Sequence, residues 1–193
     1  MVSSCSKIAQ TDYKERHDRV ASMLHWNLCR NYNLPTADKW WEHKIDKVLQ
    51  KEDVKILWDF KIQTDKHLAH NIPDITVVEK KRVWMIDVAI PGDGRIEEKE
   101  LEKISKYQDL KMVIERLWEK QATVVPVVIG SLGAIPRDLR KHLRTIGLES
   151  LLPNQLQKTD LLEQQISYAS TSEIPRSCGA VLPSRMERAT FRN

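Results

Sequence analysis

Two aspartates in the middle of the chain have the residue type and the spacing of a metal-binding hairpin. Asp74 and Asp87 lie in two apolar stretches that are joined by Lys80 and Lys81. If these stretches pair as antiparallel strands around that turn, Asp74 stands opposite Asp87, with Cβ atoms roughly 4.5–5.5 Å apart. Two like charges so close need a cation between them, and oxygen ligands favour a hard ion, so we expect Mg²⁺ or Mn²⁺ there. The alternative is that each aspartate caps a strand end and faces solvent.

The helix expected after the hairpin carries charged side chains on its apolar face. At about 100° per residue, Lys103 and Glu100 fall inside the apolar stripe and Lys106 falls at its margin. The stripe itself comprises Ile96, Ile104, Tyr107, Leu110, Ile114, Leu117 and Trp118. A charge on a face that packs against a sheet needs a partner, and Asp74, Asp87 or a ligand held by them would supply one. The alternative is that Lys103 extends its ammonium group to solvent.

The elements that must position these side chains follow from periodicity. Strict alternation of apolar and polar residues predicts strands, and a period of 3.6 predicts helices. We predict helices over residues 11–33, 95–120, 136–146 and 156–166, and strands over residues 54–64, 73–79, 82–90 and 122–130. The fold class is therefore α/β (α+β), with a sheet flanked by helices. Residues 167–193 are rich in Ser, Arg and Pro without a period, which predicts a disordered tail.

Composition excludes several classes of protein. The chain has 193 residues, 41% of them hydrophobic, with three cysteines and a formal net charge of +4. This composition excludes a wholly disordered chain, a disulfide framework and a membrane span. The sequence also shows no leader-like segment, so we expect an intracellular protein without membrane contact. Basic residues could contact DNA phosphates, or could form an ordinary solvated surface: Lys80, Lys81, Arg82, Arg137, Arg140 and Lys141.

One further pair has the spacing of metal ligands. His25 and Cys29 are one helical turn apart in the first predicted helix. The neighbouring Leu24 and Leu28 favour ordinary packing over metal binding at this point.

Beyond single residues, an ordered set of blocks resembles a known family. The blocks are RHDRV (16–20), HWNLC (25–29), KWWEH (39–43), KILWDF (55–60), Pro73-Asp74, IDVAIP (86–91), KYQDL (106–110) and VVPVVIGSLG (124–133). Together they resemble the restriction-like endonuclease domain of non-LTR retrotransposons, a branch of the PD-(D/E)xK nuclease superfamily. The resemblance covers about residues 5–150 and implies a core in the order αβββαβ, with the endonuclease domain over residues 11–150.

The resemblance implies a metal-dependent cut in DNA, with Asp74 and Asp87 as metal ligands and catalytic residues. The superfamily's usual lysine would fall at position 89, which is Ala89 in this chain. The retroelement enzymes are similar in taking a lysine from the following helix, which points to Lys103 first and Lys106 second. The implied partners are DNA and, in a longer product, retroelement RNA or a reverse transcriptase region. The implied location is the nucleus.

The start of the chain resembles the end of an upstream zinc knuckle, with Cys5 as its last ligand and residues 1–10 as its remnant. A lone thiol cannot close a tetrahedral site, so we expect no zinc. The resemblance then implies a fragment or an orphan copy of a larger element, with residues 151–193 as a partly helical tail. The alternative to an active nuclease is an inactive remnant that binds nucleic acid or has only a structural role.

Overall fold

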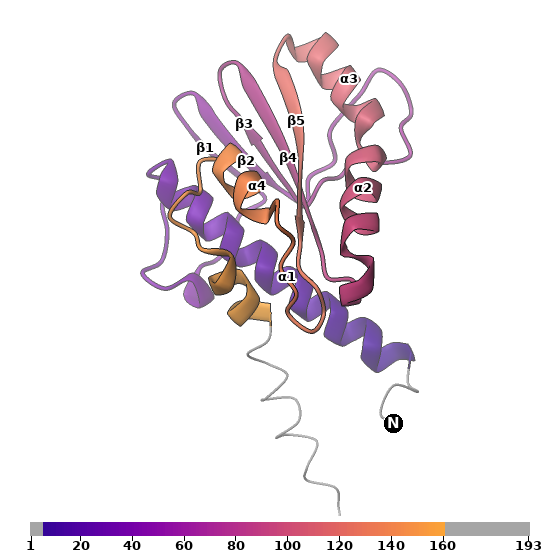
Figure 1. Cartoon of the computed structure of the whole chain (residues 1–193). Helices are drawn as coiled ribbons and strands as arrows, with labels where there is room; N and C mark the ends of the chain where they lie inside the picture. Colours follow the sequence, from indigo (N-terminus) through magenta and orange to yellow (C-terminus); the bar gives the residue numbers. More distant parts are fainter. Residues whose placement is uncertain (1–5, 161–193) are drawn as a thin grey trace, which may run out of the picture.

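The chain builds a five-stranded mixed sheet with helices on both faces, as seen in a computed structural model that describes residues 6–160 (Figure 1). The predicted mixed α/β class is therefore confirmed. The strands are β1 (Val48–Lys51), β2 (Val54–Trp58), β3 (Ile75–Val78), β4 (Arg82–Ala89) and β5 (Gln121–Val128). They lie in sequence order across the sheet; β4 and β5 are parallel and the other neighbours antiparallel. The helices are α1 (Ser6–Asn31), α2 (Ile96–Lys106), α3 (Gln108–Trp118) and α4 (Leu139–Thr145), with short 3-10 turns at Trp40–Glu42 and Asp93–Arg95.

The central hairpin has the predicted register. Ile75 pairs with Ile86 and Val78 pairs with Val83 across β3 and β4. Continuing this register by one residue places Asp74 opposite Asp87. Residues 83–89 of β4 are buried on both faces, so the tight turn through Lys80 and Lys81, and not alternating burial, fixes the register.

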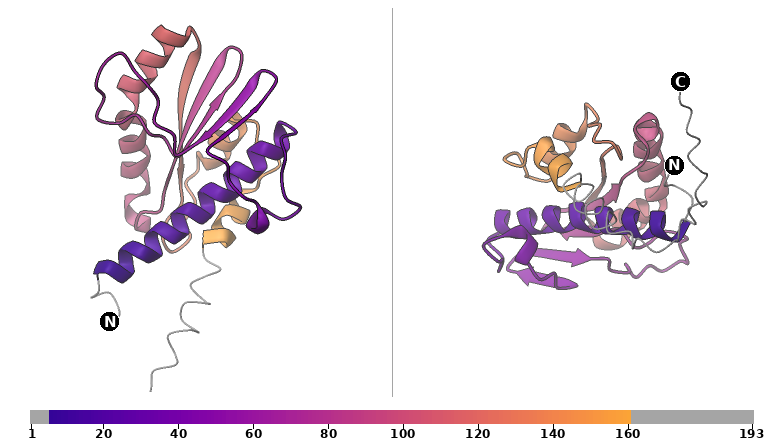
Figure 2. Two further views of the ribbon diagram at one scale, coloured as in Figure 1. Left: turned by 180° about the vertical axis from the view of Figure 1, so that it is seen from behind. Right: turned by 90° about the horizontal axis from the view of Figure 1, so that it is seen from below.

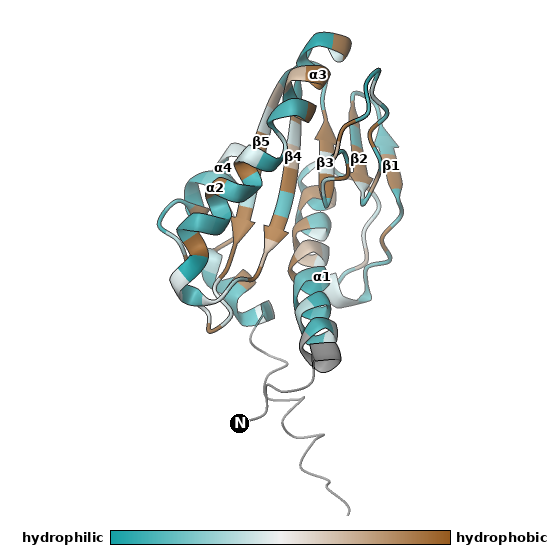
Figure 3. Ribbon diagram, turned by 90° about the vertical axis from the view of Figure 1, so that its right-hand side faces the viewer, coloured by the Kyte–Doolittle hydropathy of each residue, from teal (hydrophilic) through white to brown (hydrophobic). Residues whose placement is uncertain are grey.

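The sheet separates two apolar layers. Leu24 and Leu28 of α1 and Leu139 and Leu143 of α4 pack on one face, together with Ile86 and its alternating neighbours. The other face carries α3 and the end of α2, and its layer includes Val83, Met85, Tyr107, Leu110 and Ile114. Figure 2 shows α1 crossing the sheet, and in Figure 3 the middle of the sheet is mainly brown whereas outward helix surfaces are mainly teal. The described part of the chain holds no helix with both the length and the apolar character of a membrane span.

Several elements are shorter than periodicity predicts, and two of them differ most. The strand predicted over residues 54–64 ends at Trp58, because Asp59 takes a left-handed backbone conformation with φ of 42°. Residues 59–74 then form a loop before β3. The helix predicted over residues 95–120 is broken at Tyr107, whose φ of −108° and ψ of 13° end α2 before α3 begins. The strand β1 was not expected from the sequence.

The folded unit extends past the predicted boundary at residue 150. Residues 153–160 are helical, and Leu151 and Leu156 are buried in the layer with α1. Arg16 of α1 makes two hydrogen bonds to the buried Asp160, at 2.8 and 2.7 Å. At the other end, residues 6–10 belong to α1. Cys5, the rest of the predicted helix 156–166 and the predicted tail 167–193 lie outside the described residues.

Candidate active site

The predicted acidic pair lies at the end of the sheet where β4 finishes and β3 begins. Asp87 is 1% exposed on the face that α2 and α3 cover, whereas Asp74 lines an open cleft of about 660 Å³. Lys103 of α2 and His17 of α1 line the same cleft. In Figure 3 the lower end of β4 lies between α2 and α1, which shows how both helices reach this point. The aspartates do not face solvent as simple strand caps.

Asp87 is surrounded by proton donors from the break between α2 and α3. The Lys103 ammonium contacts Oδ2, and Lys106 Nζ lies 3.4 Å from Oδ1. The phenol of Tyr107 also lies 2.5 Å from Oδ1 and 2.9 Å from the carbonyl of Ile72. Since the phenol has one proton, the shorter contact to the carboxylate takes it. Burial, and then the charge of Asp87, raises the pKa of Tyr107, so the phenol stays protonated.

Asp74 is held from α1 and from the backbone of β4. Its Oδ2 accepts hydrogen bonds from Nε2 of His17 at 3.1 Å and from the Val88 amide at 2.7 Å. Burial opposes ionisation of Asp74, but His17, the Val88 amide and the charge of Lys103 outweigh it and lower its pKa. Burial likewise lowers the pKa of His17, but Asp74 and Asp18 outweigh that effect and raise it to about 8. The result is an ionised carboxylate beside a protonated imidazole at neutral pH.

Lys103 supplies the cation that the facing aspartates require. Its side chain is 12% exposed, so it does not extend to solvent. Burial opposes its charge, but Asp87 and then Asp74 raise the pKa of Lys103 overall. The ammonium group therefore pairs directly with Asp87, and its charge adds to that of His17 in stabilising Asp74.

The donor set of this site suits a divalent ion of the hard class. Both candidate ligands are carboxylates, and oxygen is the donor that Mg²⁺ and Mn²⁺ prefer. Asp74 lines the cleft from which an ion would enter. Both oxygens of Asp87 are already contacted by cations or a phenol, so an ion bound there would take over contacts that Lys103 and Lys106 now make.

The other charge of the apolar stripe lies elsewhere. Glu100 faces His142 of α4, with Oε1 and Nδ1 3.7 Å apart, and it does not reach Asp74 or Asp87. Burial raises the pKa of Glu100 and lowers the pKa of His142.

The predicted DNA-contacting residues do not gather at the site. Lys80, Lys81 and Arg82 form the exposed turn between β3 and β4, at the opposite end of the sheet. Five residue steps separate Arg82 from Asp87, which is roughly 17 Å at about 3.3 Å per residue. The other three, Arg137, Arg140 and Lys141, are exposed at and just before α4.

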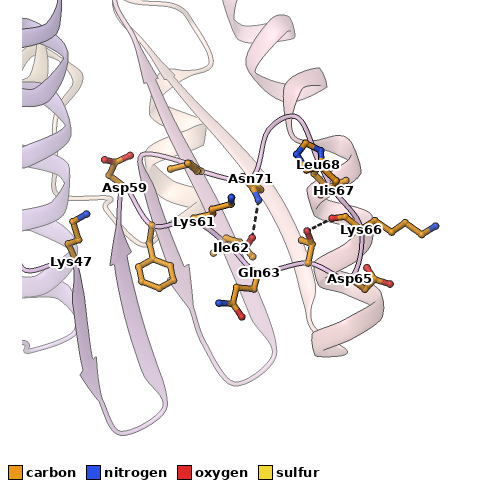
Figure 4. A pocket seen from close by; sticks show the side chains of 13 residues that line it. Lys47, Asp59, Lys61, Ile62, Gln63, Asp65, Lys66, His67, Leu68 and Asn71 are labelled. Carbon is orange, nitrogen blue, oxygen red and sulfur yellow. Dashed lines mark hydrogen bonds between the residues drawn. The ribbon is translucent and has the colours of Figure 1, made fainter.

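A second cavity adjoins the cleft and carries basic residues that periodicity did not single out. It has a volume of about 830 Å³ and is lined by the loop after β2 together with Lys47 (Figure 4). Lys61, Lys66 and the half-exposed Phe60 line it as well. Asp59 lines both hollows, so the two are neighbours. The loop is braced by a hydrogen bond of 3.2 Å from the Asn71 side chain to the Ile62 carbonyl, drawn in Figure 4.

Two residues of the cluster were not assigned to it from the sequence. His17 lies three residues before Val20 and seven before Leu24, on the buried stripe of α1, so its position could have been inferred. Tyr107 was assigned to the apolar stripe, although a buried phenol needs a hydrogen-bond partner. The helix break that brings Tyr107 to Asp87 contains no Pro or Gly, so the sequence does not predict it.

A separate group of potential metal ligands lies between α1 and the segment that precedes β1. The donor atoms of His25, Cys29 and His43 lie within 4.8 Å of one another. Nitrogen and sulfur donors suit Zn²⁺ and not Mg²⁺. The expectation of no zinc rested on Cys5, outside the described residues, whereas this donor set does not involve Cys5.

No protein-family model matches the chain, and no curated protein matches it. The chemistry of the site therefore rests on the geometry of its residues.

Proposed function

We propose that this chain is a metal-dependent DNA endonuclease domain of the PD-(D/E)xK type, as in non-LTR retrotransposons. The observation that carries the proposal is the convergence of Asp74, Asp87 and Lys103 at one end of the sheet, beside an open cleft. Two acids on paired strands and a lysine nearby are the groups that phosphodiester hydrolysis with a divalent ion requires.

The order of elements supports the same assignment. Helix α1, the strands β2, β3 and β4, helices α2 and α3, and strand β5 follow one another as in an αβββαβ core, with β1 as an added edge strand. Ala89 occupies the usual lysine position on β4 and has no exposed surface. Lys103 reaches the second acid from α2 instead, so the site would not need a lysine on the strand.

Each side chain has a distinct role in the proposed reaction. Asp74 and Asp87 would hold Mg²⁺ or Mn²⁺, which when bound polarises the scissile phosphate and makes a bound water more acidic. Lys103 orients the attacking water or stabilises the negative charge that grows on the phosphate. Lys106 and Tyr107 hold the Asp87 carboxylate in place, and His17 does so for Asp74.

The cavity beside the cleft is the better route for the DNA strand than the turn between β3 and β4. It brings Lys47 and Lys61 next to Asp59 at the edge of the acidic site. Ammonium groups neutralise backbone phosphates, and an aromatic ring such as Phe60 can stack on an unpaired base.

A second candidate function is nucleic-acid binding without cleavage. The observation that favours it is the closed state of Asp87, which is 1% exposed with both oxygens in contact with donors. A carboxylate neutralised in this way stabilises the fold without needing a metal ion.

The test is plasmid nicking with purified protein in Mg²⁺ or Mn²⁺. Asp74→Asn, Asp87→Asn and Lys103→Met remove one functional group each while keeping side-chain size. Lys99→Met on α2 and Asp109→Asn on α3 are matched controls, since neither residue lies at the cleft. Binding of a fluorescent duplex is measured in parallel for every variant.

We expect the wild type and both control variants to cut DNA. Each site variant should cut at least about a hundredfold more slowly. Binding without cutting by the folded wild type favours the second candidate. Equal cutting by wild type and by Asp74→Asn and Asp87→Asn would show that the activity comes from a contaminant.

A further inference from the structure

The group formed by His25, Cys29 and His43 lies apart from the acidic cluster and is not explained by nuclease chemistry. His25 and Cys29 are fully buried on one face of α1, and His43 follows the 3-10 turn Trp40–Glu42. Residues four apart on a helix project to the same side, so α1 presents its imidazole and thiol together. His43 approaches this pair from a segment 14 residues away in sequence.

The three donors converge on one point. Nδ1 of His25 lies 3.0 Å from Nε2 of His43 and 3.6 Å from Sγ of Cys29. A tetrahedral zinc ion with Zn–N near 2.1 Å and Zn–S near 2.3 Å separates its donors by roughly 3.3 Å for two nitrogens and roughly 3.6 Å for nitrogen and sulfur. The observed spacings therefore match a zinc site after small movements of the imidazoles.

The surroundings hold these donors in place. The ring of Trp58 packs edge-on against His25, with centroids 5.6 Å apart at 88°. Trp26 also donates a hydrogen bond of 2.8 Å to the carbonyl of Ala37, which fixes the segment before His43 on α1. His43 is half-buried, so its side of the group is open for a water molecule as a fourth ligand.

We propose that His25, Cys29 and His43 bind one Zn²⁺ ion, with water in the fourth position. The thiol of Cys29 releases its proton to solvent as the Zn–S bond forms, and both imidazoles bind as neutral ligands through the nitrogens that now face each other. The ion ties the segment before β1 to α1 and to Trp58, which lines the cleft with Asp74. Its role is structural and does not depend on the proposed nuclease activity.

The experiment measures metal content and cobalt binding on the full chain. Protein purified without a metal-affinity tag is analysed for zinc, stripped with a chelator and titrated with Co²⁺. A sulfur-to-cobalt charge-transfer band in the near ultraviolet reports a thiolate ligand directly. Cys29→Ser and His43→Gln are the test variants, and Cys178→Ser and His70→Gln are controls that keep the three proposed ligands.

The expected result is one zinc ion per chain and a charge-transfer band that Cys29→Ser abolishes. His43→Gln keeps the fold, as judged by circular dichroism, and weakens cobalt binding by more than roughly tenfold, since loss even of outer-shell partners costs about 10–100-fold. Zinc raises the thermal midpoint of the wild type and of both controls but not of the test variants.

Two results would overturn the proposal. One is a folded wild type that neither contains zinc nor gives the charge-transfer band. The other is metal binding that is unchanged in Cys29→Ser and His43→Gln, which would place the ion on other residues.

Discussion

At the scale of single residues, the buried charge of Asp87 depends on the donors around it. Tyr107 is fully buried, and its phenol lies 2.5 Å from Oδ1 of Asp87. Tyr107→Phe keeps the ring and removes only the donor. Since hydrogen bonds to charged groups contribute about 1.5–3 kcal/mol, we expect the free energy of unfolding to fall by that amount in urea titrations. Tyr13→Phe is the control, because Tyr13 is 42% exposed, and equal stability of the two variants would contradict the assigned contact.

The pair of His17 and Asp74 predicts a pH dependence of stability. Contact with Asp74 raises the pKa of His17 from 6.5 to about 8, after the opposing effect of burial. A group with a raised folded-state pKa contributes stability that is complete below pH 6.5 and is lost as the pH rises through about 8. At about 1.4 kcal/mol per pKa unit, the loss amounts to about 2 kcal/mol.

This loss is measurable by urea titrations between pH 6 and 9 in the presence of EDTA. The pKa values of His25, His43 and His142 are lowered, chiefly by burial, so their contributions change below pH 6.5. Burial raises the pKa of the Cys29 thiol, so its contribution changes near pH 9 and above, and the range between is dominated by His17. His17→Gln should flatten the profile, whereas His70→Gln in the exposed loop should follow the wild type. A wild-type profile that is flat over this range would rule out the ionised pair.

At the scale of elements, the last described helix is held to the fold by a buried ion pair in addition to the packing of Leu156. Arg16 and Asp160 are 7% and 0% exposed, and Arg16 also donates to the carbonyl of Ser131 at 2.7 Å. Breaking a buried pair by removing one partner costs about 3–5 kcal/mol, because the other charge stays buried. We expect Asp160→Asn to lose that much unfolding free energy, and a chain ending at residue 150 to lose more.

The comparison that checks this prediction is a chain that ends at residue 160. It keeps Leu151, Leu156 and Asp160, so its thermal midpoint should match that of the full chain. A chain ending at 150 with the midpoint of the full chain would show that the helix over residues 153–160 is not needed.

How far the sequence predicts these elements depends on how local their causes are. The register of β3 and β4 is predictable, because a tight turn at Lys80 and Lys81 joins the two stretches and sets which residues pair. The end of β2 is not predictable from the sequence. Asp59 continues the alternation of apolar and polar residues, but its backbone adopts a left-handed conformation with φ of 42°. Strand β1 is a short edge strand with mostly exposed residues, so it carries almost no apolar signal.

In the candidate site, too, contacts with local causes are predictable from the sequence and tertiary contacts are not. Asp74, Asp87 and Lys103 come together as predicted, because the hairpin register and the helical period place them there. His17 joins them only through the packing of α1 across the sheet, a tertiary contact between residues 57 positions apart. The His25 and Cys29 spacing is visible in the sequence, but His43 reaches them through an irregular segment whose course no periodicity predicts.

At the scale of the whole molecule, basic groups lie at both ends of the sheet. The formal net charge of +4 does not show which of these basic groups could contact DNA, but their positions in the fold differ. Lys47 and Lys61 border the cavity next to the acidic site, whereas Lys80 and Lys81 form the turn roughly 17 Å or more away. Both pairs are exposed, so each can be neutralised without disturbing the core.

The salt dependence of DNA binding separates these two ends. Each phosphate neutralised by a lysine contributes about 0.9 to the slope of log K against log salt concentration. We expect the double variant Lys47→Gln/Lys61→Gln to weaken binding of a short duplex and to lower the slope by about 2. Lys80→Gln/Lys81→Gln removes the same charge and should leave the slope within about 0.5 of the wild type. Equal effects of the two double variants would mean that binding follows overall charge, and a larger effect at Lys80 and Lys81 would move the DNA path away from the cleft and from Asp74.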